Sequence, residues 1–122
     1  MGFNLKIGEK AKEGNRVIVK TVKLKDAPAD GVPTDYINER WPSYVGWTDF
    51  YNAVGLREMF IDDLLQRHPG WVKLTQGHKA EVDRAYHSIK LFPAKHQVRL
   101  EWLKFWVDWA LVNCKEPIFY NS

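Results

Sequence analysis

The sequence is almost without cysteine: Cys114 is the single one among 122 residues. One cysteine excludes an internal disulfide and argues against a zinc site built on thiolates. Cys114 follows a strongly apolar run, so we expect it to fill space in the core as a small apolar side chain rather than to act as a reactive thiolate.

Long apolar runs are also absent. No stretch approaches the roughly 20 residues that a membrane-spanning helix requires. The opening residues, MGFNLKIGEK, lack the apolar run of a secretory signal peptide, and no Asn-X-Ser/Thr acceptor for glycosylation occurs. We therefore expect a cytoplasmic protein with no membrane partner.

The motifs of the common enzyme classes are missing as well. GxSxG, HExxH, GxGxxG and GxxxxGK do not occur. The four histidines stand nine or ten residues apart, whereas helical metal ligands stand three or four apart. Asp62 and Asp63 are adjacent, so on a helix their carboxylates diverge by about 100° and do not form an acid and base pair. We therefore predict no catalytic residue, no metal and no cofactor.

The composition that remains is that of a globular domain, with 45% hydrophobic, 27% charged and 14% aromatic residues. A chain of 14.3 kDa buries about two-thirds of its unfolded surface, which is enough for one core. We predict a single domain over residues 1–122 with an α+β, helix-dominant fold. Its parts are an N-terminal antiparallel β-hairpin at about 1–25, a pinned loop at about 26–46, a body of three or four packed helices at about 47–113, and a docked tail at about 114–122.

The hairpin is predicted from two short patterns. Phe3, Leu5 and Ile7 alternate with polar residues, and the later run RVIVKTVKLK is rich in β-branched residues. From Asp26 to Gly46 no period is visible, and proline and glycine interrupt the chain. This segment is too rich in aromatic residues for a solvated linker, so we expect it to lie against the body.

Helical periodicity begins near Trp47, with Thr48 as the expected N-cap. Gly55 interrupts the pattern, and it either ends this helix or is tolerated within it. Thr75 is expected to open the next helix, and Pro93 to end it.

The last predicted helix runs from about Ala94 to Asn113 and is apolar over most of its surface. Either it is the central helix of the domain or part of it is an interface, and we predict the central position. Trp102, Trp106 and Trp109 are spaced four and three residues apart, which is typical of a core stripe. The tail after Pro117 is again apolar and is expected to dock on the body.

Positive charge is concentrated at the start of the chain. Residues 1–25 hold seven basic and two acidic residues, whereas residues 26–122 hold eleven basic and thirteen acidic ones. Lys20, Lys23 and Lys25 fall along one predicted strand and are the candidate contacts to a polyanion. Lysines also occur on edge strands simply to prevent aggregation, and this alternative stays open.

The sequence by itself does not identify a function. Large aromatic residues anchor many protein interfaces, and one domain of this size hardly encloses all six tryptophans. The leading hypothesis is a non-enzymatic module that binds another protein or a second copy of itself. Nucleic-acid or polyanion binding through the hairpin is the alternative, and a small enzyme without a recognisable motif comes third. The candidate interface residues are Tyr36, Trp41, Tyr44 and Trp47.

Overall fold

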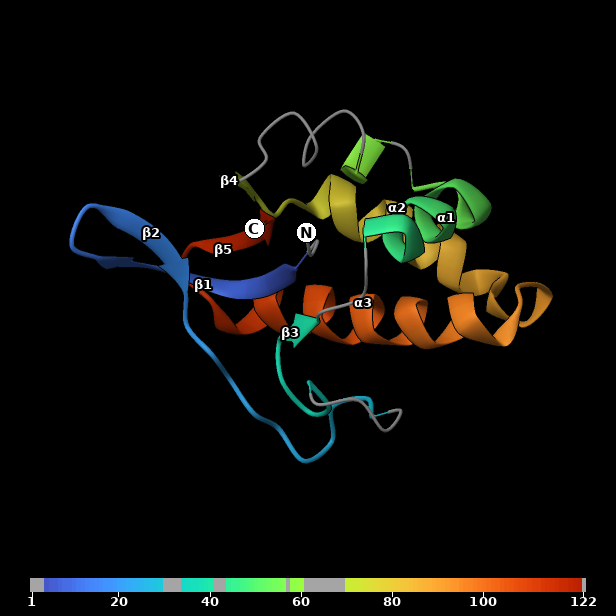
Figure 1. The fold of residues 1–122 in the computed structure, drawn as a ribbon, viewed down its shortest axis with the longest axis horizontal. Coiled ribbons are helices and arrows are strands. Elements are labelled where there is room, and N and C mark those ends of the chain that lie inside the picture. Colours follow the sequence, from blue (N-terminus) through green and yellow to red (C-terminus); the bar gives the residue numbers. More distant parts are fainter. Residues whose placement is uncertain (1–3, 30–33, 41–43, 57, 61–69, 122) are drawn as a thin grey trace.

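The computed structural model describes residues 4–29, 34–40, 44–56, 58–60 and 70–121 (Figure 1). It has an α+β fold, with a five-stranded antiparallel sheet and helices, as the sequence predicts. The predicted dominance of helices is confirmed only in part, because 47% of the structure is helical and 27% is strand. The sheet is larger than the predicted hairpin, since three further strands join it.

The sheet brings together both ends of the described chain. Its strands are β1 (Leu5–Glu13), β2 (Arg16–Val19), β3 (Glu39–Arg40), β4 (Gly70–Lys73) and β5 (Pro117–Asn121). They lie in the order β2-β1-β5-β4, with β3 also paired to β1, and every pairing is antiparallel. The tail that was expected only to dock is therefore the strand β5, inserted between β1 and β4 (Figure 1).

The predicted hairpin is formed by β1 and β2, joined at a turn where Gly14 has a φ of +64°. Its second strand is shorter than predicted, because β2 ends at Val19. Beyond that point the side chain of Asn38 bonds to Lys20 and Val22 in place of a partner strand. The prediction that Lys20, Lys23 and Lys25 run along one strand is therefore wrong.

The helices are α1 (Tyr44–Val54), α2 (Gln76–His87), the 3₁₀ helix η2 (Ile89–Leu91) and α3 (Ala94–Asn113). Because α1 begins at Tyr44, Thr48 lies inside the helix and is not its N-cap. Gly55, with a φ of +83°, ends α1, and the N–H groups of Gly55 and Leu56 both donate to the carbonyl of Tyr51.

Thr75 caps α2 as predicted: its hydroxyl accepts from the N–H of His78, and the His78 ring accepts from the N–H of Thr75. Pro93 does not end this helix, because α2 already ends at His87 and η2 follows it. Pro93 instead stands at the N-cap of α3, where its fixed φ is compatible with the start of a helix.

The helix α3 runs along the sheet and contacts β1, α1, α2 and η2 (Figure 1). Trp102 and Trp106 are completely enclosed, whereas Trp109 is half-buried and Val112, at the end of the helix, is 82% exposed. The centre of the core is thus the middle of α3.

Among the helices of the described residues, none combines the length and hydropathy needed to cross a membrane.

Candidate functional site

The two faces of the sheet differ in chemistry because side chains alternate along each strand. One cross-strand row, Ile7, Phe119 and Val72, packs into the hydrophobic core. The neighbouring row points the other way and consists of a lysine and two aromatic residues side by side on β1, β5 and β4: Lys6, Tyr120 and Trp71. All three side chains of this second row are partly exposed.

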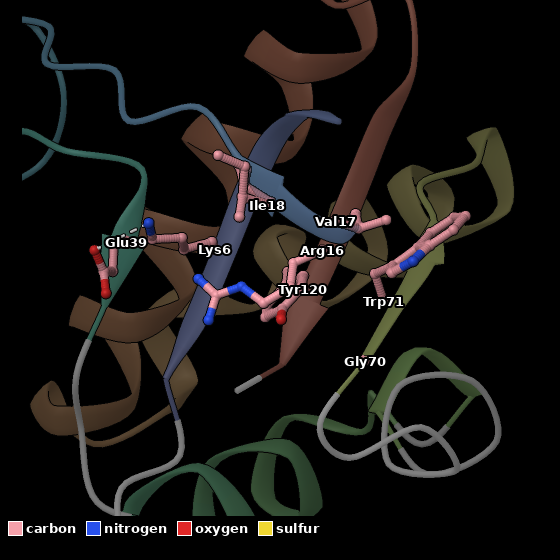
Figure 2. A pocket seen from close by; sticks show the side chains of 9 residues that line it. Lys6, Arg16, Val17, Ile18, Glu39, Gly70, Trp71 and Tyr120 are labelled. Carbon is pink, nitrogen blue, oxygen red and sulfur yellow. Dashed lines mark ion pairs between the residues drawn. The ribbon is translucent and has the colours of Figure 1, made fainter. Parts of the chain in front are cut away.

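A groove of about 500 Å³ lies over this second row (Figure 2). Its floor includes Lys6, Tyr120 and Trp71, and β2 forms a wall. Figure 2 shows the guanidinium of Arg16 reaching over this groove from the start of β2. Glu39 of β3 also lines it, with its carboxylate 3.6 Å from the Nζ of Lys6.

Trp71 also lines a second groove, of about 340 Å³. The Nζ of Lys10 lies 4.4 Å from the centroid of the Trp71 ring, a cation–π contact. The other polar residues of this groove are Lys73, Lys115 and Glu116, and its apolar lining comes from Pro117 and Ile118. We call the surface formed by the residues of both grooves the Trp71 face.

Glu9 fixes the segment that carries Lys115. The Glu9 carboxylate accepts hydrogen bonds from the backbone N–H groups of Lys115, at 2.9 Å, and Glu116, at 2.7 Å. These two bonds hold the pKa of Glu9 below its ordinary value. The loop between α3 and β5 is thereby tied to β1, next to the second groove.

The residues that line the Trp71 face have an excess of positive charge. Its grooves are lined by five basic residues and two acidic ones, Glu39 and Glu116. The whole chain has eighteen basic and fifteen acidic residues, so thirteen of each sign remain elsewhere. The net charge of +3 therefore equals the excess on this one face. The five basic residues are Lys6, Lys10, Arg16, Lys73 and Lys115.

A further groove, of about 490 Å³, lies between α2, α3 and residues 26–29 and has a different character. Lys104, which lines it, donates to Asp83 at 2.7 Å and to Asp108 at 2.6 Å, and Lys79 lies 3.1 Å from Asp108. Lys79 also donates to Asp83 at 2.8 Å. Its bonds to Asp83 and Asp108 raise the pKa of Lys79, and the bonds from Lys104 and Lys79 lower that of Asp83. Its charges are largely occupied with one another, so this groove is a weaker candidate than the Trp71 face.

Of the candidate interface residues from the sequence, the structure describes the side chains of Tyr36 and Trp47. Trp47 has no exposed area and stacks against Phe60, so it belongs to the core and does not line an interface. Tyr36 is 40% exposed. Trp41 and the side chain of Tyr44 lie outside the described residues.

The three candidate polyanion contacts, Lys20, Lys23 and Lys25, are exposed in the segment after β2. They are not among the residues that line the Trp71 face. Sequence reasoning did not assign Trp71 and Tyr120 to any site. The available signal was the β-favouring composition of GWVK and PIFYN, which predicts two short strands but not their pairing.

The titratable groups with raised pKa values outside the grooves include Cys114 and Glu81. Burial raises the pKa of the Cys114 thiol to about 11, so the thiol is protonated at neutral pH. Glu81 accepts the N–H of Met59 at 2.9 Å, and burial raises its pKa. Within the described ranges, no three His, Cys, Asp or Glu residues gather closely enough to hold a metal ion.

Comparison of the chain with models of protein families, with curated proteins and with solved structures finds no match.

Proposed function

We propose that this protein is a non-enzymatic binding module whose partner is a polyanion, bound on the Trp71 face. The observation that carries the proposal is the row of Lys6, Tyr120 and Trp71, which lies at the floor of one groove and borders a second. Basic side chains are present on both sides of the indole, so an extended anionic chain can keep its charges paired along the whole face.

Charge supports a polyanion over a neutral partner. The Trp71 face carries an excess of three positive charges, whereas the rest of the chain is balanced. Positive charge in a groove raises the local concentration of anions and speeds their association. Binding of this kind weakens steeply with salt, because counterions are released when the partner binds.

The test is binding to heparin, a simple polyanion, at about 50 mM and about 200 mM salt. The variant Lys10→Glu/Lys73→Glu reverses two charges on the Trp71 face. The variant Lys20→Glu/Lys23→Glu changes the net charge equally at lysines that lie outside the grooves, and it is the matched control. We expect the first variant to lose at least about tenfold in affinity at the lower salt concentration, and the second to stay within about threefold of the parent.

Two results would overturn the proposal. One is the absence of heparin binding at the lower salt concentration. The other is an equal loss in the two double variants, which would show that binding follows net charge rather than this face. Circular dichroism and urea unfolding of each variant establish that it is folded before binding is compared.

A protein partner is the second candidate function, and it is favoured by Tyr36. This residue has a φ of +70°, a backbone conformation that costs a residue with a Cβ about 1–2 kcal/mol. Strained backbone is enriched at functional sites, and the Tyr36 side chain is exposed. The test is the solution mass of the parent and of Tyr36→Asn, because asparagine tolerates this backbone conformation. A complex or dimer that the variant loses, with no loss of stability, supports this candidate.

The cytoplasm remains the proposed location. It is supported by the single cysteine, which cannot form an internal disulfide and which burial holds in the thiol form.

A further inference from the structure

We infer that the polyanion is a single-stranded nucleic acid and that one of its bases stacks on the indole of Trp71. This inference rests on the proposed function, because it names the partner of the same face. Charge alone does not distinguish a nucleic acid from a sulfated polysaccharide or a polyphosphate. The aromatic residues do, because among these polymers only a nucleic acid has flat bases that stack on an indole or a phenol.

The aromatic residues are placed for stacking. Trp71 and Tyr120 are directly opposite each other on paired strands, and both are partly exposed on the side away from the core. Directly opposite side chains begin about 4.5–5.5 Å apart. Figure 2 shows both side chains among the residues that line the groove, with the guanidinium of Arg16 directed toward Lys6. Both aromatic side chains therefore line one groove together with the basic residues Lys6 and Arg16.

The position of Lys10 indicates which side of the indole a base occupies. The Lys10 Nζ lies over the Trp71 ring at 4.4 Å on the side of the smaller groove. The larger groove borders the same indole and contains no other residue in cation–π contact with it. A base in the larger groove thus stacks on Trp71 while Lys10 stays in place.

The arrangement of charge around the indole fits a chain that passes across it. Lys6 and Arg16 line the groove in which the base stacks, whereas Lys73 and Lys115 line the groove beyond Trp71. Phosphates on either side of the stacked nucleotide each meet basic side chains. A single strand makes this arrangement because its bases are free to turn toward the protein, whereas the bases of a duplex are stacked and paired with one another.

The first experiment compares three probes: a 12-nucleotide single strand of deoxythymidylate, a duplex of equal length, and heparin. The variants are Trp71→Leu, which removes the aromatic ring, and Trp71→Phe, which keeps one. Trp109→Leu is the matched control, because Trp109 is a half-buried tryptophan on α3. We expect Trp71→Leu to weaken binding of the single strand by about 5- to 150-fold, the range for one base stacked on an aromatic residue.

Heparin binding by Trp71→Leu stays within about twofold of the parent, and Trp71→Phe keeps most of the affinity for the single strand. The control Trp109→Leu stays within about twofold for every probe. Equal losses for heparin and the single strand in Trp71→Leu would overturn the stacking inference while leaving the proposed function intact. If neither heparin nor the oligonucleotide binds, the proposed function itself fails.

The second experiment uses the unaltered protein, so it does not depend on the folding of a variant. The bound oligonucleotide is crosslinked by ultraviolet light, and the crosslinked peptides are mapped. We expect adducts in the peptides that contain Trp71 or Tyr120. Crosslinks confined to other peptides, or a duplex that binds as tightly as the single strand, would contradict the inference.

Salt dependence gives an independent readout. Each phosphate neutralised on a single strand contributes about −0.7 to the slope of log affinity against log salt concentration. Lys73→Gln is expected to make this slope shallower by about 0.7, whereas Trp71→Leu leaves the slope unchanged. If Trp71→Leu made the salt slope as shallow as Lys73→Gln does, the indole would act only by positioning basic side chains, and the stacking inference would be wrong.

Discussion

The side chain of Asn38 occupies the space next to Gly8, where a Cβ would lie 2.8 Å from the Asn38 Nδ2. From this position Nδ2 donates to the carbonyls of Ile7, at 2.9 Å, and Lys20, at 2.8 Å. The Oδ1 accepts the N–H of Val22 at 2.9 Å. One buried amide therefore joins β1 to the segment that follows β2, and it needs glycine beside it.

This relationship predicts a coupled pair of substitutions. Asn38→Ala leaves three backbone groups without this partner, one in a buried bond and two in partly buried ones, and should lower the free energy of unfolding by about 2–4 kcal/mol. Gly8→Ala should lower it by about 1–3 kcal/mol through crowding. In the double variant the space of the amide is vacated, so the total loss is smaller than the sum of the two. Urea unfolding of the four proteins measures the coupling, and strictly additive losses would contradict it.

The central position of α3 predicts unequal costs along one helix. Trp106 is completely buried, so Trp106→Ala should lower the free energy of unfolding by about 3–5 kcal/mol. Val112→Ala is the matched control near the end of the same helix, where the side chain is 82% exposed, and it should stay within about 0.5 kcal/mol of the parent. If Trp106→Ala unfolded at the same urea concentration as the parent, the conclusion that α3 is the centre of the core would be wrong.

Alanine substitutions at two glycines, Gly55 and Gly77, are expected to change the free energy of unfolding in opposite directions. Gly55 has a φ of +83° with nothing within 4 Å of an added Cβ, so Gly55→Ala costs only backbone strain, about 1–2 kcal/mol. Gly77 lies in the first turn of α2, where an added Cβ meets the Thr75 hydroxyl at an acceptable 3.4 Å. Gly77→Ala should therefore raise stability by about 0.4–1 kcal/mol. Thermal unfolding checks both, and a stabilised Gly55→Ala would show that α1 does not end there.

The sequence predicted the elements whose signals are local. The range Ala94–Asn113 agrees with the prediction for α3 because Pro93 marks its start and an apolar surface continues to its end. The N-cap at Thr75 could be predicted because its signal is also local in sequence. Chain segments that are stabilised by their own neighbours in sequence can be predicted from those neighbours.

The candidate site could not be predicted in this way, because it is created by pairing over long distances. Lys6 meets Tyr120, and Tyr120 meets Trp71, only because β5 inserts between β1 and β4. A short apolar tail such as Pro117–Asn121 reads equally as a docked segment or as a strand. Sequence reasoning located the positive excess in residues 1–25 but selected Lys20, Lys23 and Lys25, since the strand was expected to continue where Asn38 interrupts it.

The pH dependence of stability follows from His96. His96 is 3% exposed, the centroid of its ring lies 6.1 Å from that of Phe50, and burial lowers its pKa below the ordinary value of 6.5. The carboxylate of Asp49, 3.8 Å from the His96 Nε2, opposes this shift without cancelling it. The unfolded chain therefore binds a proton at a higher pH than the folded protein does.

The sign of the effect follows directly. Above about pH 6.5 the ring is neutral in both states and stability is unaffected, whereas below it the unfolded state gains a proton first and stability falls. The loss from this one group is at most about 1.4 kcal/mol per pH unit. His96→Leu removes the titrating ring. The difference in stability between parent and variant should therefore be constant from pH 8 to pH 7. From pH 6.5 to pH 5 the parent should lose stability relative to the variant. Urea unfolding at each pH measures this difference, and NMR titration of the His96 ring should give a midpoint below 6.5. Stability curves that stay parallel down to pH 5, together with an ordinary midpoint, would show that burial does not control this histidine.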